Sequence, residues 1–436
     1  MPNSKYLIQN YEEIGTSNLR RKILDLVDRS ISEFYPATIM RKEIDSLKAV
    51  FQNSKRLFII GFGKCSLSMF RGIPDSLSEM AEYSGVIVPK NLETGDYGGR
   101  PEILKGNHPI IGTDTEVSSR KLLSKLSRLS EDDTVLVLIS GGGSALFEIP
   151  EDGITYDFIA SISKCMMNNG GNIDELNAMR QSISKVKGGK LAGILYPSRV
   201  FSFVISDVPG DREDIIASGP LVRAQTTKEE RKSIIKKFEP LCPDLKKIDD
   251  GYIDYKIPDE SFKRVKQKII LKNHDIVQYF VNKLRNDGNS VVDLGSNIQG
   301  NVKDSSEYFV EQMKKAYSNL GPSYVVGGGE TTVDVRGNGI GGRNCELSVR
   351  VARLMEKDDE FMFSSIGTDG IDGISPAMGG IVDREFLNET SKAEIDESLE
   401  KNDTYNLLNK KRSAIITGFT ENNVSDIMIG YYGGKY

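Results

Sequence analysis

Glycines in this sequence cluster directly after short apolar runs, together with serines and a lysine. Residues 61–64 (GFGK) follow the run 56–60, and residues 140–144 (SGGGS) follow the run 134–139. Glycines let a phosphate approach backbone N–H groups at the start of a helix, and serine hydroxyls add donors. Lys64 could neutralise phosphate charge. The two segments predict an anion site, and a tight turn without a ligand is the alternative for each.

Acidic residues and an arginine stand at comparable positions further along. Asp207 follows the run 200–205, where a carboxylate can hold Mg²⁺ or take a hydroxyl proton. Arg343 begins an expected helix at 343–355 and opposes its dipole, so a bidentate contact with phosphate or carboxylate is one explanation. Residues 367–373 (GTDGIDG) suit Mg²⁺ or polyol hydroxyls. A turn aspartate, an exposed arginine and a solvated turn are the alternatives.

These residues require a scaffold that gathers the ends of strands. Buried strands are expected at 56–60, 84–88, 134–139 and 200–205. Helical spacing lies between them, and the order strand, loop, helix, strand predicts βαβ units and a parallel sheet. A second β/α series is expected between 267 and 417, beginning with a strand at 267–271. Such sheets bind ligands at the carboxyl ends of their strands, where these motifs fall.

The length of 436 residues exceeds what one core usually supports, so we expect two domains. The charged, weakly patterned stretch 224–264 is interpreted as the connection between them. The boundary is therefore placed between domains 1–225 and 226–436.

Composition excludes several classes of protein. With 38% hydrophobic residues, 27% charged residues and a net charge of −5, neither general nucleic-acid binding nor membrane binding is expected. The 2 histidines exclude a His-rich metal site, and the 4 cysteines include no Cys-x-x-Cys pair, so separate thiols in a reducing cytoplasm are expected. The first ten residues lack the apolar block of a signal peptide, and no apolar run reaches transmembrane length. A cytoplasmic protein is expected.

Motifs in one order along nearly the whole chain resemble the type-2 glycerate kinases, the MOFRL family. They lie at residues 61–64, 107–109, 138–146, 177–180, 187–192, 205–211, 217–220, 328–332, 341–346, 367–373 and 423–426. Four features depart from the family pattern, one of which is the charged and poorly matched stretch 224–264. Cys65 stands where alanine is usual, Cys345 stands where glutamine is usual, and residues 417–423 match loosely.

The resemblance implies an α/β fold with two three-layer α/β/α domains. The first would have a Rossmann-like parallel sheet and the second a mixed sheet, with a MOFRL-like part at about 322–430 and the active site in the interdomain cleft. The implied activity is transfer of phosphate from ATP to D-glycerate with Mg²⁺ or another divalent cation, with 2-phosphoglycerate the favoured product. A homodimer is one assembly that it allows.

The motifs and the resemblance together supply a set of expected site residues. Lys64, Arg343 and Asp207 are the expected catalytic residues. Residues expected to bind ATP or phosphate are Gly61, Gly63, Ser140, Gly141, Gly142, Gly143, Ser144, Gly328, Gly329 and Thr331. Residues expected to bind substrate are Asn344, Asp369 and Asp372. Residues expected to hold the metal are Asp207, Glu330 and Asp369.

Two other functions compete with the kinase. One is an NAD(P)H-dependent hydroxypyruvate reductase, since residues 61–64 begin like a dinucleotide fingerprint. Ser66 stands where that fingerprint needs its third glycine, and residues 84–90 offer no acid to hold a ribose. The other is a non-catalytic sensor of a small anion. Turnover separates an enzyme from a sensor, and the required cofactor separates a kinase from a reductase.

Overall fold

The computed structural model describes residues 6–92, 94 and 99–435, so residues 1–5 of the polar N-terminal segment lie outside it. The chain divides into two compact units. One is Pro36–Ile270, here called the Rossmann-like unit, and the other joins Met1–Tyr35 to Leu271–Tyr436, here called the terminal unit. Within the described residues, no helix combines the length and apolar character needed to cross a membrane.

Six strands of the described residues form the sheet of the Rossmann-like unit. They are β1 (Leu57–Phe62), β2 (Tyr83–Pro89), β3 (Glu102–Gly106), β4 (Thr134–Ile139), β5 (Arg199–Ser206) and β6 (Val265–Lys272). Their order is β3-β2-β1-β4-β5-β6, and β1 pairs in parallel with both β2 and β4. Every residue of β1 and β4 is buried, which explains their continuous apolar runs. The Rossmann-like parallel sheet is thus confirmed.

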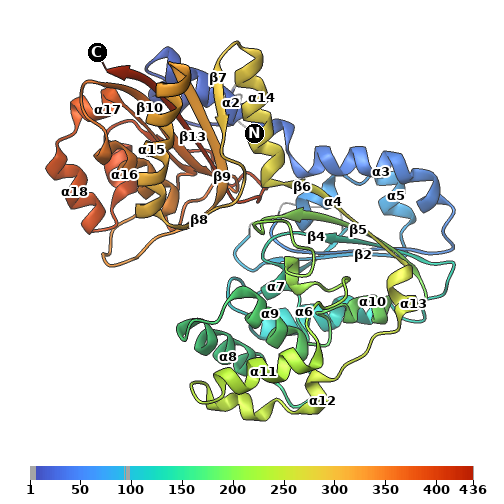
Figure 1. The fold of residues 1–436 in the computed structure, drawn as a ribbon. Coiled ribbons are helices and arrows are strands. Elements are labelled where there is room, and N and C mark those ends of the chain that lie inside the picture. Colours follow the sequence, from blue (N-terminus) through green and yellow to red (C-terminus); the bar gives the residue numbers. More distant parts are fainter. Residues whose placement is uncertain (1–5, 93, 95–98, 436) are drawn as a thin grey trace. The chain divides into compact units, whose positions relative to one another are not determined.

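Helices cover both faces of this sheet. The unit contains α3 (Pro36–Gln52), α4 (Ser66–Arg71), α5 (Asp75–Met80), α6 (Thr113–Ser124), α7 (Gly143–Leu146), α8 (Tyr156–Asn168), α9 (Ile173–Ser182), α10 (Lys190–Leu195), η1 (Ile216–Ser218), α11 (Lys228–Phe238), η2 (Pro243–Lys247), α12 (Asp250–Ile253) and α13 (Asp259–Lys263). Figure 1 shows α3, α4 and α5 on one face, and α6, α7, α9 and α10 on the other. The strand order reverses between β1 and β4, so ligands are expected where these two strands end.

The charged stretch 224–264 is folded, so its interpretation as a connection between domains is wrong. Phe238 and Leu245 are fully buried and pack in one cluster with Ile159 and Met166 of α8. The charges form the solvent side of short helices, as in the pair between Lys232 and Asp250. The following strand, β6, joins β5 at the edge of the first sheet. The compact units therefore differ from the expected boundary at 225 and 226.

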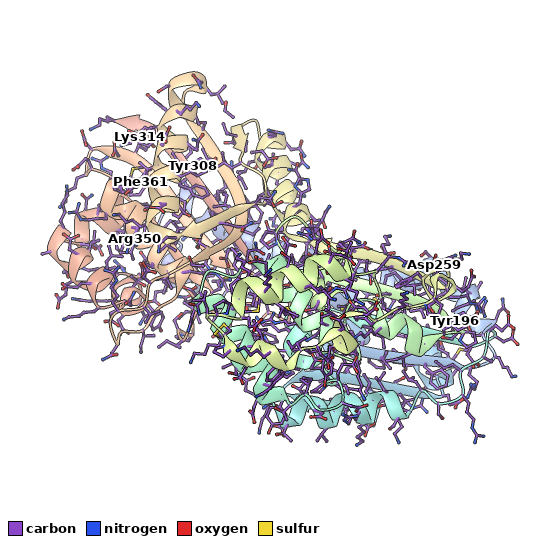
Figure 2. The ribbon with its side chains drawn as sticks, turned by 60° about the horizontal axis from the view of Figure 1, so that its bottom comes forward. Tyr196, Asp259, Tyr308, Lys314, Arg350 and Phe361 are labelled. Atoms are coloured by element: carbon purple, nitrogen blue, oxygen red, sulfur yellow. A yellow bond between two sulfur atoms is a disulfide. The ribbon has the colours of Figure 1, made fainter. Side chains whose placement is uncertain are left out.

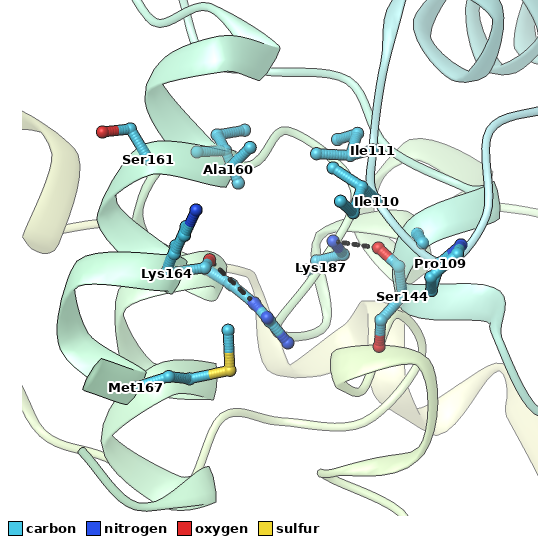
Figure 3. A pocket seen from close by; sticks show the side chains of 13 residues that line it. Pro109, Ile110, Ile111, Ser144, Ala160, Ser161, Lys164, Met167 and Lys187 are labelled. Carbon is cyan, nitrogen blue, oxygen red and sulfur yellow. Dashed lines mark hydrogen bonds between the residues drawn. The ribbon is translucent and has the colours of Figure 1, made fainter. Parts of the chain in front are cut away.

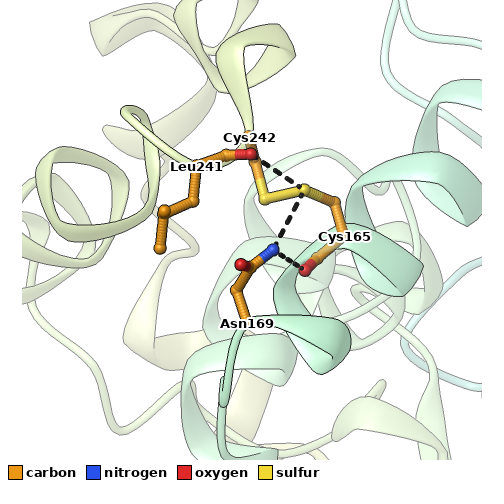
Figure 4. The surroundings of a disulfide bond; sticks show 4 residues. All are labelled: Cys165, Asn169, Leu241 and Cys242. Atoms are coloured by element: carbon orange, nitrogen blue, oxygen red, sulfur yellow. Dashed lines mark hydrogen bonds between the residues drawn. A yellow bond between two sulfur atoms is a disulfide. The ribbon is translucent and has the colours of Figure 1, made fainter.

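Two of the four cysteines are joined, which overturns the expectation of separate thiols. A disulfide connects Cys165 of α8 to Cys242, which precedes η2, across 77 residues of sequence (Figure 4). Asn169 donates to the carbonyl oxygen of Cys165 at 2.9 Å. The other two cysteines, Cys65 and Cys345, are free and buried. No short spacing in the sequence predicts the pair, because only the packing of α8 against the chain around η2 brings the two cysteines together.

Strands of both directions form the sheet of the terminal unit. In the described part of the chain they are β7 (Ser290–Asp293), β8 (Ile298–Asn301), β9 (Ser323–Thr332), β10 (Asp359–Gly367), β11 (Gly379–Asp383), β12 (Ala414–Ile415) and β13 (Asp426–Lys435). Their order is β12-β11-β10-β13-β9-β7, with β8 also paired to β9. β13 runs antiparallel to β10 and β9, whereas β7 and β8 run parallel to β9. The expected mixed sheet is confirmed.

Helices also lie on both faces of this second sheet. They are α1 (Tyr11–Ile14), α2 (Asn18–Glu33), α14 (Asn273–Asn286), α15 (Val302–Leu320), α16 (Arg343–Leu354), α17 (Arg384–Glu389), α18 (Lys392–Glu400) and α19 (Thr404–Lys410). A Cβ on Gly327 would face Phe309 of α15, and one on Gly328 would face Val277 of α14, so these helices cover opposite faces. Tyr308 on α15 is 40% exposed, whereas Phe361 of β10 is buried in the core (Figure 2).

A buried ion pair joins the two sequence segments of the terminal unit. Arg20 of α2 is 1% exposed and binds both oxygens of Asp383, with Nε–Oδ2 2.7 Å and Nη2–Oδ1 2.9 Å. Its Nη1 donates to the Arg412 carbonyl at 2.8 Å. Residues far apart in sequence therefore complete one core, which explains why the unit contains both ends of the chain.

Candidate active site

The loops after β1 and β4 are hydrogen-bonded to each other at the reversal of the strand order. The N–H of Lys64 donates to the Gly141 carbonyl at 2.9 Å, and the N–H of Cys65 donates to Ser140 Oγ at 2.9 Å. Gly63 has φ 123°, and a Cβ there would lie 2.3 Å from Ser140 Oγ, so only glycine permits this approach. Two of the predicted loops are therefore in direct contact.

The glycine-rich segment 140–144 forms a tight turn into α7. Gly142 adopts φ 80°, and the N–H of Gly143 donates to the Ser140 carbonyl at 3.2 Å. Because α7 has only 4 residues, its dipole is small, so an anion here would depend on local N–H groups and hydroxyls. Gly61 lies inside β1, where a Cβ would press on Leu138 at 3.2 Å. Its role is close packing of the strand.

His108, which was not among the expected site residues, lies at the same turn. A Cβ on Gly142 would lie 2.8 Å from His108 Nε2, so the ring contacts the glycine backbone. Burial and, to a smaller extent, the positive charge of Lys64 together lower the pKa of His108 to about 4. The imidazole is therefore neutral at pH 7 and can donate or accept a hydrogen bond. Its signal in the sequence was the motif at 107–109.

A buried network of hydrogen bonds and one ion pair holds Ser144 in place. Lys187 is 1% exposed, and its Nζ donates to the Ser144 carbonyl at 2.6 Å and pairs with Glu148. Burial lowers the pKa of Lys187, and the charge of Glu148 opposes that shift. Ser144 Oγ also lies 3.1 Å from Ser218 Oγ, and Ser218 donates to Asn177 Oδ1 at 2.7 Å. These contacts fix the last residue of the predicted phosphate loop.

Asp207 directly follows β5, the strand beside β4. It is half-buried and lies on the same sheet edge as the loops after β1 and β4. The position fits the expected carboxylate at the carboxyl end of a strand. Its role as base or metal ligand stays a prediction.

Arg343 is held by two carboxylates of the terminal unit. Its Nε and Nη2 bind Oδ2 and Oδ1 of Asp426 at 2.6 and 3.0 Å, and its Nη1 lies 3.0 Å from Glu330 Oε1. Burial alone would lower the pKa of Arg343, but Asp426 reverses this, and the net shift is upward. The arginine at the start of α16 thus has local counter-charges. Asp426 was not among the expected site residues, although it closes the motif at 423–426.

Three of the expected substrate and metal residues gather beside this arginine. A Cβ on Gly367 would lie 3.3 Å from Asn344 Nδ2 and from Asp369 Oδ1, and 3.5 Å from Asp426 Oδ1. Asp372 accepts the backbone N–H of Asn344 at 3.0 Å and thereby caps α16. Burial raises the pKa of Asp372 to about 6, against the opposing effect of the backbone N–H groups of Asn344 and Cys345. The terminal unit therefore assembles a polar site from α16, the 367–373 turn and β13.

The glycines 327–329 lie inside a strand. β9 continues through them to Thr332, and Gly328 and Gly329 pair with Ile427 and Asp426 of β13. A Cβ on Gly328 would lie 1.9 Å from Asn273 Oδ1, so the glycine makes room for α14. Thr331 is buried in the same strand, with a hydroxyl that has no partner among the described residues. Phosphate binding by Gly328, Gly329 and Thr331 stays a prediction.

The expected metal ligands belong to different units. Asp207 lies in the Rossmann-like unit, whereas Glu330 and Asp369 lie in the terminal unit. Among the described residues, no group of three or more His, Cys, Asp or Glu side chains is arranged to hold a metal ion. Mg²⁺ is commonly held by one or two carboxylates together with phosphate oxygens of the substrate, so single carboxylates at strand ends still suit it.

A cavity of about 360 Å³ lies beside Ser144 in the Rossmann-like unit (Figure 3). Its walls are mostly apolar and come from residues 109–111 and from α8. Arg180, Lys187, Ser144 and Ser163 contribute the polar lining, and Lys164 contributes a further charge. Apolar walls with a few polar groups are typical of small-molecule sites.

Comparisons with known proteins find relatives along nearly the whole chain. The profile of the MOFRL family matches residues 323–426, and a domain of unknown function, DUF4147, matches residues 22–246. Glycerate 2-kinase of Picrophilus torridus is 46% identical over 433 residues, covering 98% of this chain and all of that protein. The crystal structure of glycerate kinase from Thermotoga maritima aligns with a TM-score of 0.83 at 30% identity, covering 94% of this chain and 98% of that one.

A protein of Agrobacterium vitis with the provisional name hydroxypyruvate reductase is 31% identical, over 85% of this chain and 98% of that protein. The fold, the two matched family profiles and the near-complete alignments define an α/β phosphotransferase class. The chain belongs to the type-2 glycerate kinases, the MOFRL family.

Proposed function

We propose that this protein transfers the terminal phosphoryl group of ATP to the 2-hydroxyl of D-glycerate. The observation that carries the proposal is the contact between the Lys64 turn and the 140–144 turn, where two parallel strands end side by side. That position offers glycine backbone, hydroxyls and one positive charge to a phosphate. Phosphoryl transfer needs positioning and charge neutralisation of this kind. Membership of the glycerate kinase family supports the choice of acceptor.

In the proposed reaction, the acceptor oxygen forms a bond to the γ-phosphorus while the bond from that phosphorus to the β-phosphate oxygen breaks. ADP leaves with the electron pair, and Asp207 takes the hydroxyl proton. Lys64 stabilises the negative charge of the phosphoryl group. Mg²⁺, carried mainly by the phosphate oxygens, would supply further charge neutralisation, and Asp207 is the carboxylate at this sheet edge that could hold it. The neutral ring of His108 can donate a hydrogen bond to the phosphoryl group without adding charge.

Arg343 enters this proposal in a changed role. Two of its nitrogens are committed to Asp426, so it would reach a phosphate only by exchanging Glu330, whose side chain is 44% exposed. Asn344, Asp369 and Asp372 remain proposed partners of the substrate hydroxyls. A cytoplasmic location and a homodimer remain proposals, and the Cys165–Cys242 disulfide makes the location worth testing directly.

The test is ADP release from purified protein given D-glycerate, ATP and Mg²⁺, with each component omitted in turn. Glycerate-dependent ADP release is expected, and ³¹P–¹H coupling in the product should show phosphorus coupled to the single C2 proton. Coupling to the two C3 protons would instead assign the 3-hydroxyl. A parallel assay follows NAD(P)H oxidation with hydroxypyruvate. Oxidation without any ADP release would overturn the kinase in favour of the reductase, and no turnover in either assay would favour a sensor.

A further inference from the structure

We propose that the cavity beside Ser144 is the binding site of the acceptor acid, and that the Arg180 guanidinium holds its carboxylate. This inference rests on the proposed function and assigns a part of the site in which Ser144 is the one expected residue among the described lining. All of the residues that line the cavity lie in the Rossmann-like unit. Ser144 belongs both to the cavity lining and to the predicted phosphate loop, so a molecule in the cavity lies directly beside that loop.

Arg180 is the polar group of the cavity that most needs a partner. Its Nε donates to Ser163 Oγ at 3.2 Å, and this is its only hydrogen bond within the described residues. Within that same part of the chain, no carboxylate forms an ion pair with it, and burial lowers the pKa of its guanidinium. A cation in such surroundings is costly unless an anion joins it. Its two terminal nitrogens are available to bind that anion as a planar fork.

The charge of the cavity fits a monoanion. Lys187 is neutralised by Glu148 and also donates to the Ser144 carbonyl, the contact drawn in Figure 3. Arg180 therefore leaves one net positive charge in the buried part of the cavity, and Lys164 adds a second charge to the lining from the exposed side of α8. The carboxylate of a small hydroxy acid carries one negative charge.

The remaining lining suits the rest of a hydroxy acid. Ser144 Oγ and Ser163 Oγ can bond to hydroxyl groups, and Ile111 and the buried Ile159 offer apolar contacts to the carbon chain. The acceptor would then be held by its carboxylate with its hydroxyl directed toward the phosphate loop at Ser144.

The experiment compares Arg180→Gln with Arg180→Lys and with the control Arg120→Gln, which removes an exposed arginine of α6. Steady-state kinetics with D-glycerate and ATP are measured for each. Arg180→Gln should raise the KM for D-glycerate about 100-fold, as loss of one partner of a buried charge pair does. The KM for ATP should stay within about twofold, and Arg180→Lys should recover only part of the loss because lysine lacks the fork. Arg120→Gln should match the unmodified protein.

Two further measurements keep the inference testable if Arg180→Gln does not fold. Ala160→Leu fills the cavity from α8 without touching a charge, and it should raise the KM for D-glycerate while leaving that for ATP unchanged. Titration calorimetry with D-glycerate alone should show binding, and the neutral amide of glyceric acid should bind much more weakly. If Arg180→Gln or Ala160→Leu raises the KM for ATP and not for D-glycerate, the cavity belongs to the nucleotide and the inference is overturned.

Calorimetry also separates this inference from the proposed function. If the protein binds D-glycerate through Arg180 but releases no ADP, the cavity assignment stands and the proposed kinase activity is wrong. If Arg180→Gln phosphorylates D-glycerate with an unchanged KM, the proposed kinase activity stands and the cavity assignment is wrong.

Discussion

The guanidinium of Arg343 donates hydrogen bonds to both carboxylate oxygens of Asp426, which lies 83 residues further along the sequence. The distances are 2.6 Å from Nε to Oδ2 and 3.0 Å from Nη2 to Oδ1. Asp426 is fully buried at the start of β13 and also accepts a hydrogen bond from Asn344 Nδ2 at 3.0 Å. Burial raises the pKa of Asp426, whereas Arg343 lowers it. The pair joins the first residue of α16 to the central strand of its sheet.

Asp426→Asn should therefore destabilise the terminal unit by about 3 kcal/mol, since it leaves the partly buried guanidinium with only the more exposed Glu330 as a counter-charge. The measurement is denaturant unfolding followed by circular dichroism. Asp396→Asn, which breaks the exposed pair with Arg353, is the control and should cost less than about 1 kcal/mol. Equal losses in the two variants would show that the Arg343–Asp426 pair contributes no more than a surface contact.

Lys64→Ala should lower kcat by about 100- to 1000-fold, because it removes a positioned charge from the turn that contacts Gly141. Its thermal unfolding should remain close to that of the unmodified protein. Lys90→Ala is the matched control, since Lys90 follows the neighbouring strand β2 and pairs with Asp114 at an exposed position. A near-normal rate in Lys64→Ala would remove this lysine from the mechanism.

His108 should make the protein less stable in mild acid. Its folded pKa is about 4 against an ordinary value of 6.5, so between these pH values the unfolded chain binds a proton that the folded chain does not. The contribution of neutral His108 to the free energy of unfolding is complete above pH 6.5 and is lost as the pH falls through 4. In His108→Asn, the free energy of unfolding should fall by roughly 1–2 kcal/mol less over this pH range, allowing for partial exposure of the ring.

The measurement for His108 is the midpoint of thermal unfolding at a series of pH values from 7 down to 4. His274→Asn, on the exposed side of α14, should leave the profile unchanged. Identical profiles for His108→Asn and the unmodified protein would contradict the burial of this ring in solution.

The Cys165–Cys242 disulfide should contribute about 2–4 kcal/mol to stability, since it closes a loop of 77 residues. The double variant Cys165→Ser with Cys242→Ser should unfold at lower denaturant concentration than the oxidised protein. A thiol reductant should move the unmodified protein to the same midpoint and leave the double variant unaffected. A reductant effect of equal size on the double variant would assign it to some other cause.

The sequence predicted β1, β4 and β5 well because a strand covered on both faces must be apolar at nearly every position. It gave no comparable signal for β13, the central strand of the second sheet, because three glycines interrupt its apolar residues. Glycines 327–329 likewise interrupt the apolar residues of β9, yet the strand continues to Thr332. There Gly328 is explained by the close approach of α14 and Gly329 by that of the β8 backbone at Ile298, and both are tertiary contacts.

The site divides in the same way. Local sequence determined that Lys64, the 140–144 turn and Asp207 stand at the ends of parallel strands, because the alternation of strand and helix sets the edge at which those ends lie. Only the tertiary structure decided that Arg180 lines a cavity, that Asp426 binds Arg343 and that Cys165 meets Cys242. Each of these relationships depends on side chains far apart in the chain, and their packing leaves no periodicity or spacing that the sequence could display.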